Sequence, residues 1–519
     1  MKGFFLFIYK LFKNLSKGEL ILIFSGFFLS IFLLVIFFNF LIKNLPIREP
    51  TYGGVLKIGL TQSINTINPI LAQNTSEKTI VNLIYDSLLR PDGNGGYEYE
   101  LAKRITPLEN GLKYELELKD VYWNNGEKIT SDDVIASFDY FKNYNEITKR
   151  LLNNIKLEKL DSTRILFNLS IKDNYFIQKI SFVKIVPVKV FSKYNFDEWQ
   201  KNEDELVKVS SGPFILDKKY NFKNNLQVFE LVRNKFYFKK PYIDKIILYA
   251  YPDFESAYVA LKVKEIDFLG GVKPSYLASS IGRKYEVKKI ILPRVIALFF
   301  NSKKVNKDIK SLNSIDRNFI VKNIFENYAE PAYSIFSPSI RKILGLNIFS
   351  AENMATNTLD YSDVEIIVPD NFFMIKIAEY LEKNFNFKIN IENIEDINNK
   401  IIPSKEYQAL LYGLSFNLLP DLRAFFDPNS QFNLTEVNDN EILKIIQNLE
   451  SGKAEDFKNN LENLGNLINN KEPIIFIVNP YYIYFAVKNL KGINIFYLND
   501  PSEIFVKIED WYIKEKIKW

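Results

Sequence analysis

An uninterrupted apolar run near the N-terminus constrains this chain more than any other feature. Residues 20–42 carry no charged side chain and are overwhelmingly hydrophobic. As a helix rising ~1.5 Å per residue, this run is long enough to cross the roughly 30 Å hydrocarbon core of a bilayer. A cleaved signal peptide would have a shorter apolar region and a small-residue cleavage site, and neither is present. We therefore expect one retained transmembrane helix.

The basic residues around this run predict its orientation. Lysines precede it at Lys2, Lys10, Lys13 and Lys17, whereas only Lys43 and Arg48 follow it closely. The positive-inside rule places residues 1–19 in the cytoplasm. After a short linker, 43–52, the rest of the chain is expected outside. The protein is thus predicted to be a single-pass plasma-membrane protein whose bulk is extracellular or periplasmic.

The composition excludes several kinds of chemistry. The chain of 519 residues contains no cysteine and no histidine. Disulfides, thiolate nucleophiles, Cys/His zinc sites and histidine acid–base catalysis are therefore ruled out. The net charge is only +5, and basic and acidic residues are interspersed. We predict no nucleic-acid partner, no metal and no other cofactor.

Hydrophobic periodicity indicates a mixture of helices and strands over the whole outer part. Residues 112–119 alternate as a half-buried strand does, and 131–143 have apolar residues at helical spacing. Farther on, a strand at 364–368, a helix at 371–384 and a strand at 387–391 form a predicted βαβ unit. The predicted fold class is therefore α/β.

A series of short motifs follows in a characteristic order. They are Gly53-Gly54-Val55, Ile67-Asn68-Pro69, Tyr85-Asp86-Ser87-Leu88, Tyr122-Trp123-Asn124-Asn125-Gly126, Ser211-Gly212-Pro213-Phe214, Arg233-Asn234-Lys235-Phe236-Tyr237, Phe300-Asn301, Asp316-Arg317 and Tyr407 to Gly413. In order and spacing, this set resembles the family 5 extracellular solute-binding proteins, the peptide- and nickel-binding receptors of ABC importers. The resemblance covers about 53–490.

The resemblance implies a two-lobed, type II periplasmic-binding-protein-like fold with an extra inserted domain, preceded here by the transmembrane helix. Lobe I would comprise 53–85, 188–292 and 478–519, the inserted domain 86–187, and lobe II 293–477. The implied function is a membrane-anchored receptor that captures peptides or similar small solutes in an interlobe cleft and passes them to ABC permease subunits. No enzymatic activity is implied.

The chain departs from the family in the predicted cleft. Peptide-binding relatives hold the ligand ammonium with an aspartate in a Gly-Trp-x-x-Asp loop, which here reads Gly413-Leu414-Ser415-Phe416-Asn417. Asn417 stands at the position of that aspartate and cannot form the charge-assisted pair with the ligand ammonium. Asp421 could take the place of the aspartate only if the loop shifts. Nickel relatives rely on histidine, which argues against nickel. The residues predicted to line the cleft are Asn68, Phe300, Asn301, Leu414, Phe416, Asn417 and Asp421.

Two alternative functions stay open. The degraded motifs and the permanent helix would also suit a sensor or scaffold with the same fold that takes no part in transport. An extracellular hydrolase with paired carboxylates would need an acidic pair, and Asp132-Asp133 is the candidate. Because these two residues stand at a predicted helix start, we expect them to cap that helix instead.

Overall fold

The computed structural model describes residues 16–43, 47–277, 284–307, 309–348, 360–415 and 422–518. The chain forms two compact units, one made of residues 1–51 with 514–519 and the other of residues 52–513. Each unit is described by itself.

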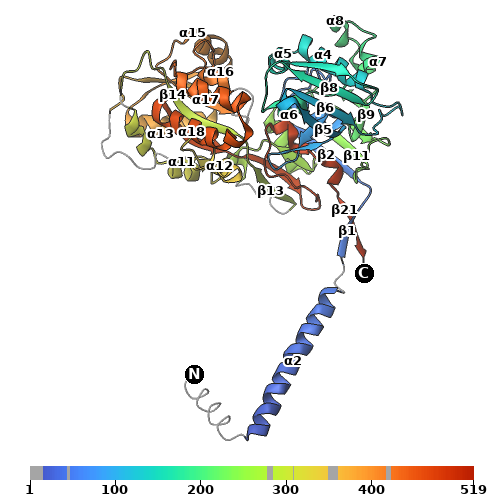
Figure 1. The fold of residues 1–519 in the computed structure, drawn as a ribbon. Coiled ribbons are helices and arrows are strands. Elements are labelled where there is room, and N and C mark those ends of the chain that lie inside the picture. Colours follow the sequence, from blue (N-terminus) through green and yellow to red (C-terminus); the bar gives the residue numbers. More distant parts are fainter. Residues whose placement is uncertain are drawn as a thin grey trace. The chain divides into compact units, whose positions relative to one another are not determined.

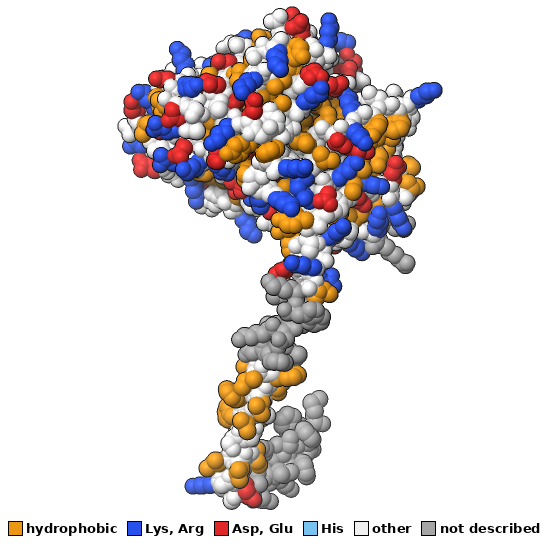
Figure 2. Space-filling model, turned by 90° about the vertical axis from the view of Figure 1, so that its right-hand side faces the viewer, with side chains coloured by type: hydrophobic (Ala, Val, Ile, Leu, Met, Phe, Trp, Pro, Cys, Tyr) orange, Lys and Arg blue, Asp and Glu red, His pale blue; other side chains and the backbone are white. Residues whose placement is uncertain are grey.

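The first unit contains the apolar helix and a two-stranded ribbon. Helix α2 (Lys17–Lys43) includes a stretch, Lys17–Phe38, that is long and apolar enough to cross a membrane, with a mean hydropathy of 3.0. The large hydrophobic side chains of residues 21–38 are exposed on its surface (Figure 2). Strand β1 (Ile47–Thr51) pairs antiparallel with β21 (Lys514–Lys518), so the two ends of the outer chain are joined.

The second unit contains a seven-stranded mixed sheet, and we call the body around it lobe I (Figure 1). Its central strand, β2, is parallel to both neighbours, and the other pairs are antiparallel. In sheet order the strands are β13 (Tyr285–Ile290), β20 (Tyr482–Val487), β12 (Phe268–Gly270), β2 (Val55–Leu60), β11 (Lys245–Ala250), β10 (Gln227–Arg233) and β9 (Phe214–Asn221).

A six-stranded sheet forms the centre of a second body, lobe II. Strands β16 and β17 are parallel and flank α13 in sequence, which confirms the predicted βαβ unit. In sheet order the strands are β15 (Ala329–Pro331), β19 (Ile474–Pro480), β14 (Arg294–Phe300), β18 (Ala409–Ser415), β16 (Glu365–Pro369) and β17 (Lys388–Glu392).

A four-stranded antiparallel sheet forms a third body, which we call the inserted domain. Its strands are β5 (Ala102–Leu108), β6 (Lys113–Leu118), β8 (Arg164–Leu169) and β7 (Ile155–Lys159), and the short pair β3 (Leu89–Pro91) and β4 (Tyr97–Tyr99) precedes them. The predicted limits of the lobes and of the inserted domain stay predictions.

The helices lie between these strands along the chain (Figure 1). They are α3 (Thr75–Ile84), α4 (Ser131–Tyr144), α5 (Glu146–Leu152), α6 (Phe176–Ser181), α7 (Val188–Phe191), α8 (Phe196–Trp199), α9 (Glu203–Leu206), α10 (Phe254–Lys262), α11 (Arg317–Asn323), α12 (Pro338–Leu344), α13 (Phe372–Phe385), α14 (Ile394–Asp396), α15 (Ile402–Ser404), α16 (Leu422–Phe426), α17 (Asn440–Ser451) and α18 (Phe457–Lys471).

In the described residues, the chain passes between the sheets of lobe I and lobe II at two places. Residues 291–293 join β13 to β14, and Tyr481 alone joins β19 to β20. The side-chain amide of Asn479 donates to the carbonyl oxygen of Arg294 at 2.8 Å, so the two crossings are tied to each other. Two short adjacent links of this kind form a hinge, since few backbone torsions must change for the lobes to rotate.

Candidate functional site

Two cavities lie beside these crossings, with volumes of about 520 and 400 Å³. Both are lined by Gly271, Lys273, Arg294 and Tyr482, so they are neighbouring parts of one cleft. The larger cavity has walls from both lobes, and the smaller is lined mainly by lobe I. Together they are within the size range of pockets that hold small-molecule ligands.

On the lobe I side, Tyr482 shapes the cleft. A side chain at Gly270 would collide with the hydroxyl oxygen of Tyr482, so the close approach of this ring requires glycine there. Burial raises the pKa of Tyr482 above its ordinary value, and Asp500 adds to the effect. Tyr482 is therefore a neutral hydroxyl at physiological pH, able to donate one hydrogen bond and accept others.

On the lobe II side, the wall is mostly apolar. Phe373 and Met374 come from the first turn of α13, and Ile394 begins α14. Helix α13 starts there because the side chain of Asn371 accepts a hydrogen bond from the backbone N–H of Phe373 at 3.1 Å. This wall suits an apolar part of a ligand.

Three charged side chains line the larger cavity. Lys273 lies 4.0 Å from Glu255 and over the ring of Phe254. Among the described residues, the side chain of Arg294 makes one hydrogen bond, to the hydroxyl of Ser415 at 3.4 Å, and Asp370 is exposed. Burial lowers the pKa of Arg294, and Asp500 opposes that effect. Within the described ranges, no group of three or more acidic side chains could hold a metal ion.

The structure places the first two predicted site residues in the interior. Asn68 is fully buried in lobe I, where its side-chain oxygen accepts from the N–H of Ile70 at 3.0 Å. Phe300 is buried in the core of lobe II beside Phe387. Neither residue is among those that line the two cavities. Their placement gives both a structural role.

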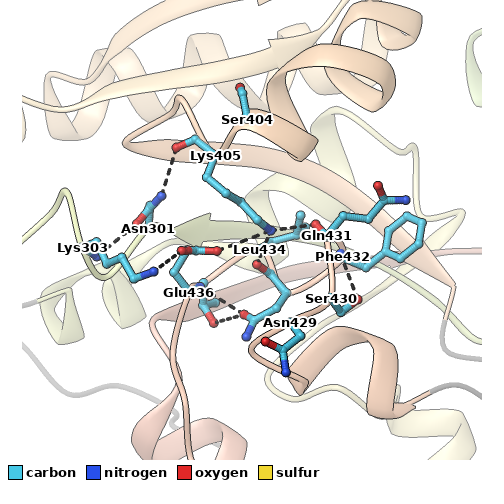
Figure 3. A network of polar contacts seen from close by, with 12 residues as sticks. Asn301, Lys303, Ser404, Lys405, Asn429, Ser430, Gln431, Phe432, Leu434 and Glu436 are labelled. Carbon is cyan, nitrogen blue, oxygen red and sulfur yellow. Dashed lines mark hydrogen bonds and ion pairs between the residues drawn. The ribbon is translucent and has the colours of Figure 1, made fainter.

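Asn301 is also buried and holds a loop instead of facing the cleft (Figure 3). Its side chain accepts from the N–H of Lys303 at 3.0 Å and donates to the carbonyl oxygen of Lys405 at 3.3 Å. The ammonium group of Lys405 in turn donates to the carbonyl oxygens of Gln431 and Asn433, both at 2.7 Å. Asn301 thus helps to fix the segment 429–436 against β14.

Leu414 lies between two residues that line the larger cavity. Its neighbours Gly413 and Ser415 line the larger cavity, whereas Leu414 belongs to the apolar core of lobe II. Successive residues of a strand point to opposite faces of the sheet. A residue one position away from a cavity-lining residue therefore faces the core instead of the cleft. Phe416, Asn417 and Asp421 lie outside the described residues.

Several other residues that the sequence singled out have structural roles. Asp133 forms a capping box with Thr130 at the start of α4, and Asp132 pairs with Lys159 at 2.7 Å. Trp123 is buried, as expected for a packing aromatic. Asp316 caps α11 by accepting from the N–H of Phe319. The acidic doublet is therefore engaged at a helix terminus.

Sequence reasoning missed Lys273, Arg294, Asp370 and Tyr482. Each stands at or just beyond the end of a strand next to a crossing or a wall of the cleft. Arg294 directly precedes the apolar run 295–300. A charged residue at the start of a buried strand is the sequence signal that could have identified Arg294 as a residue of the cleft.

Comparisons with known proteins agree with this architecture. The model of the bacterial extracellular solute-binding proteins, family 5 middle, matches residues 96–348. The oligopeptide-binding protein AppA of Bacillus subtilis is 25% identical over 309 residues, which cover 56% of this chain and 55% of AppA. Over residues 96–348 the chain is therefore similar to the family 5 solute-binding proteins. Another relative, the nickel-binding protein NikA of Staphylococcus aureus, is 25% identical over 364 residues, which cover 66% of this chain and 71% of NikA.

Solved structures share the fold over nearly the whole chain. The structure of AppA from Bacillus subtilis in complex with a nonapeptide has a TM-score of 0.68 at 19% identity, covering 90% of this chain and 100% of that structure. The ABC transporter substrate-binding protein CtaP from Listeria monocytogenes has a TM-score of 0.73 at 18% identity, with coverages of 89% and 99%. These matches establish the type II periplasmic-binding-protein fold.

Proposed function

We propose that this protein captures a small solute, a peptide or a similar molecule, between its two lobes and delivers it unchanged to an ABC permease. The observation that carries the proposal is a cleft bordered by both lobes and by the two crossings. Closure of lobes around a ligand excludes water and strengthens the polar contacts inside. The relatives that are named for binding oligopeptides and nickel support a receptor function.

The direct test is native mass spectrometry of the full chain purified in detergent. We expect a mass increment from a captured solute. A Ser415→Trp variant, which fills the larger cavity, should lose that increment. A Ser192→Trp variant, at an exposed position of lobe I, should retain it. An increment that survives Ser415→Trp, or its absence from the wild type together with a lack of binding to any peptide, would contradict the proposal.

We further propose that α2 anchors the protein in the plasma membrane with its N-terminus in the cytoplasm. The length and apolar composition of the helix support this, as does the lysine excess before it. Because the chain has no cysteine, introduced cysteines would be its only thiols. A membrane-impermeant maleimide should label Lys156→Cys on intact cells and leave Lys2→Cys unlabelled. Labelling of both to the same extent would argue against the anchor.

A further inference from the structure

We propose that Arg294 is the receptor for a carboxylate group of the solute, whose apolar part lies against the wall formed by Phe373, Met374 and Ile394. This inference rests on the proposed function, because it assigns a chemical class of ligand to the same cleft. It goes further by naming the side chain that selects the ligand and the group that this side chain recognises.

The first argument is the position of Arg294. It is the first residue of β14, directly after the crossing 291–293, and it lines both cavities. Its backbone is held on both sides. The N–H donates to the carbonyl oxygen of Leu292 at 2.8 Å, and its own carbonyl oxygen accepts from Asn479 at 2.8 Å. The side chain therefore projects into the cleft from a fixed base.

The second argument is the unused hydrogen-bonding capacity of the guanidinium group. It has five N–H donors, and the bond to Ser415 at 3.4 Å is its one hydrogen bond within the described part of the chain. No carboxylate of the described residues lies within 4.0 Å of it. When the lobes close, water leaves this charge, and a charge removed from water without a partner is strongly unfavourable. An anionic ligand group would supply that partner.

Other arginines of this protein show what a structural arginine looks like. Arg317 is almost fully buried, and its guanidinium group donates to the carbonyl oxygens of Ala332, Phe476, Asn313 and Ile315. Arg233 bonds to Asp244 and to neighbouring carbonyls. Both side chains are engaged in holding the fold, whereas Arg294 faces open space with most of its donors free.

The charges around Arg294 favour a carboxylate over a group with two negative charges, and Asp500 of lobe I, which acts electrostatically on Arg294, already offsets part of its positive charge. Lys273 lies near Glu255, which partly neutralises it. Asp370, on the lobe II side of the same cavity, makes no side-chain hydrogen bond or ion pair with another described residue, and it would repel a second negative charge. One free guanidinium group matches one planar carboxylate through two parallel hydrogen bonds. Asp370 would in turn accept a cationic group of the same ligand.

The test uses the full chain in detergent and isothermal titration calorimetry. The probes are the tripeptide Ala-Phe-Ala as the free acid and the same peptide as its C-terminal amide. We expect the wild type to bind the acid about 10–100-fold more tightly than the amide, the usual range for a charge-assisted hydrogen-bonded pair. Arg294→Gln should weaken binding of the acid by a similar factor and bring the two affinities together. Arg294→Lys should fall between them.

The matched control is Arg104→Gln, which removes an exposed arginine of the inserted domain and should leave both affinities unchanged. Equal affinities of acid and amide for the wild type would overturn the inference while leaving the proposed function intact. An unchanged ratio in Arg294→Gln would do the same. If neither peptide binds and native mass spectra reveal no captured solute, the proposed function and the inference both fail.

Discussion

The inserted domain and lobe II are joined to lobe I in different ways. One continuous apolar core runs through lobe I and the inserted domain, from Leu56 through Phe138 and Phe167 to Trp511. Lobe II has two cores, one on each side of its sheet, around Leu410 and Leu411, and the first takes in only Tyr175 of the inserted domain and Tyr497 of lobe I from outside the lobe and its crossings. A shared core resists separation because opening it would expose apolar surface to water. Lobe I and the inserted domain are therefore expected to move as one body.

Charged residues reinforce the first junction. Arg90 pairs with Glu98 at 2.8 Å and with Glu509 at 2.5 Å, and Glu100 lies 3.6 Å away. Glu509 is fully buried and belongs to the C-terminal part of lobe I. Separation of this junction would leave buried charges without partners. The cleft between the lobes has the opposite character, because neither Arg294 nor Asp370 forms an ion pair there with another described residue.

Lobe II also contacts the inserted domain at one end of α17, through what we call the latch, residues 172–175. Lys172 donates to the carbonyl oxygen of Gly452 at 2.7 Å, and the backbone N–H of Asn174 donates to that of Glu450 at 2.7 Å. The ring of Tyr175 packs edge-on against Phe457. These bonds satisfy carbonyl groups that a helix end leaves free. The latch is a small contact between two bodies, in which Tyr175 is the one residue of the segment 172–175 that joins the apolar core of lobe II.

The largest effect should come from breaking the charged junction. Glu509→Ala removes the principal partner of Arg90, and we expect a loss of about 3–5 kcal/mol in the free energy of unfolding. Urea denaturation of the full chain in detergent would measure it. The control is Arg104→Ala, whose ion pair with Glu117 is solvent-exposed and should contribute at most about 1 kcal/mol. If the two variants lose equal stability, charge does not reinforce this junction.

Much of the local structure was accessible from the sequence because its signals are local. The alternation over 112–119 predicted β6, Lys113–Leu118, and helical spacing over 131–143 predicted α4, Ser131–Tyr144. The α/β fold class followed from hydrophobic periodicity, and the resemblance to the family followed from motif order. Turns, helix caps and strand periodicity depend on residues that are close in sequence, so these signals can be recognised even at low sequence identity.

The residues of the cleft were harder to predict from the sequence, because they depend on which face of a helix or strand lines the cavity. Leu414 was chosen from a motif, yet its strand neighbours face the cavity. Asn301 looked polar and available, but three-dimensional packing uses it to fix a loop. Arg294 resembles any charged residue at a strand start, and only the adjoining crossing and the lack of a carboxylate partner reveal its position in the cleft.

The next largest effect concerns pH at the charged junction. Burial, and then the neighbouring Glu100, raise the pKa of Asp86, although Lys184 and Arg90 oppose the shift, and neither carboxylate oxygen has a hydrogen-bond partner among the described residues. A raised folded-state pKa means that this carboxyl contributes stability below about pH 4, its unfolded pKa. That stability is lost as the pH rises through the folded-state pKa. Asp86→Asn cannot ionise, so it should be more stable than the wild type at pH 8 by roughly 1–3 kcal/mol and similar at pH 4.

Thermal unfolding between pH 4 and pH 8 would measure this difference. Asp132→Asn is the control, since Asp132 is exposed and paired with Lys159. It should change stability by less than about 1 kcal/mol at either pH. An Asp86→Asn variant that is less stable than the wild type at pH 8 would mean that the carboxylate has a stabilising partner, and the charged junction would have to be interpreted differently.

The smallest effect should come from a substitution in the latch. It tests whether the contact between the inserted domain and lobe II opens while the junction between the inserted domain and lobe I stays closed. Asn174→Ala deletes the side-chain bonds to the carbonyl oxygens of Leu449 at 3.0 Å and Gly452 at 3.1 Å while keeping the backbone bond. A loss of about 1–2 kcal/mol would shift the populations of closed and open lobes roughly 5–30-fold.

Spin labels at Lys156→Cys in the inserted domain and Lys383→Cys in lobe II would report this shift as a longer distance in pulsed electron resonance. The labels are specific because the natural chain has no cysteine. Asn153→Ala, at an exposed position of the same domain, should leave the distances unchanged. If Asn174→Ala also leaves them unchanged while Glu509→Ala alters them, the mobile boundary lies between lobe I and the inserted domain, and the two junctions have been assigned the wrong way round.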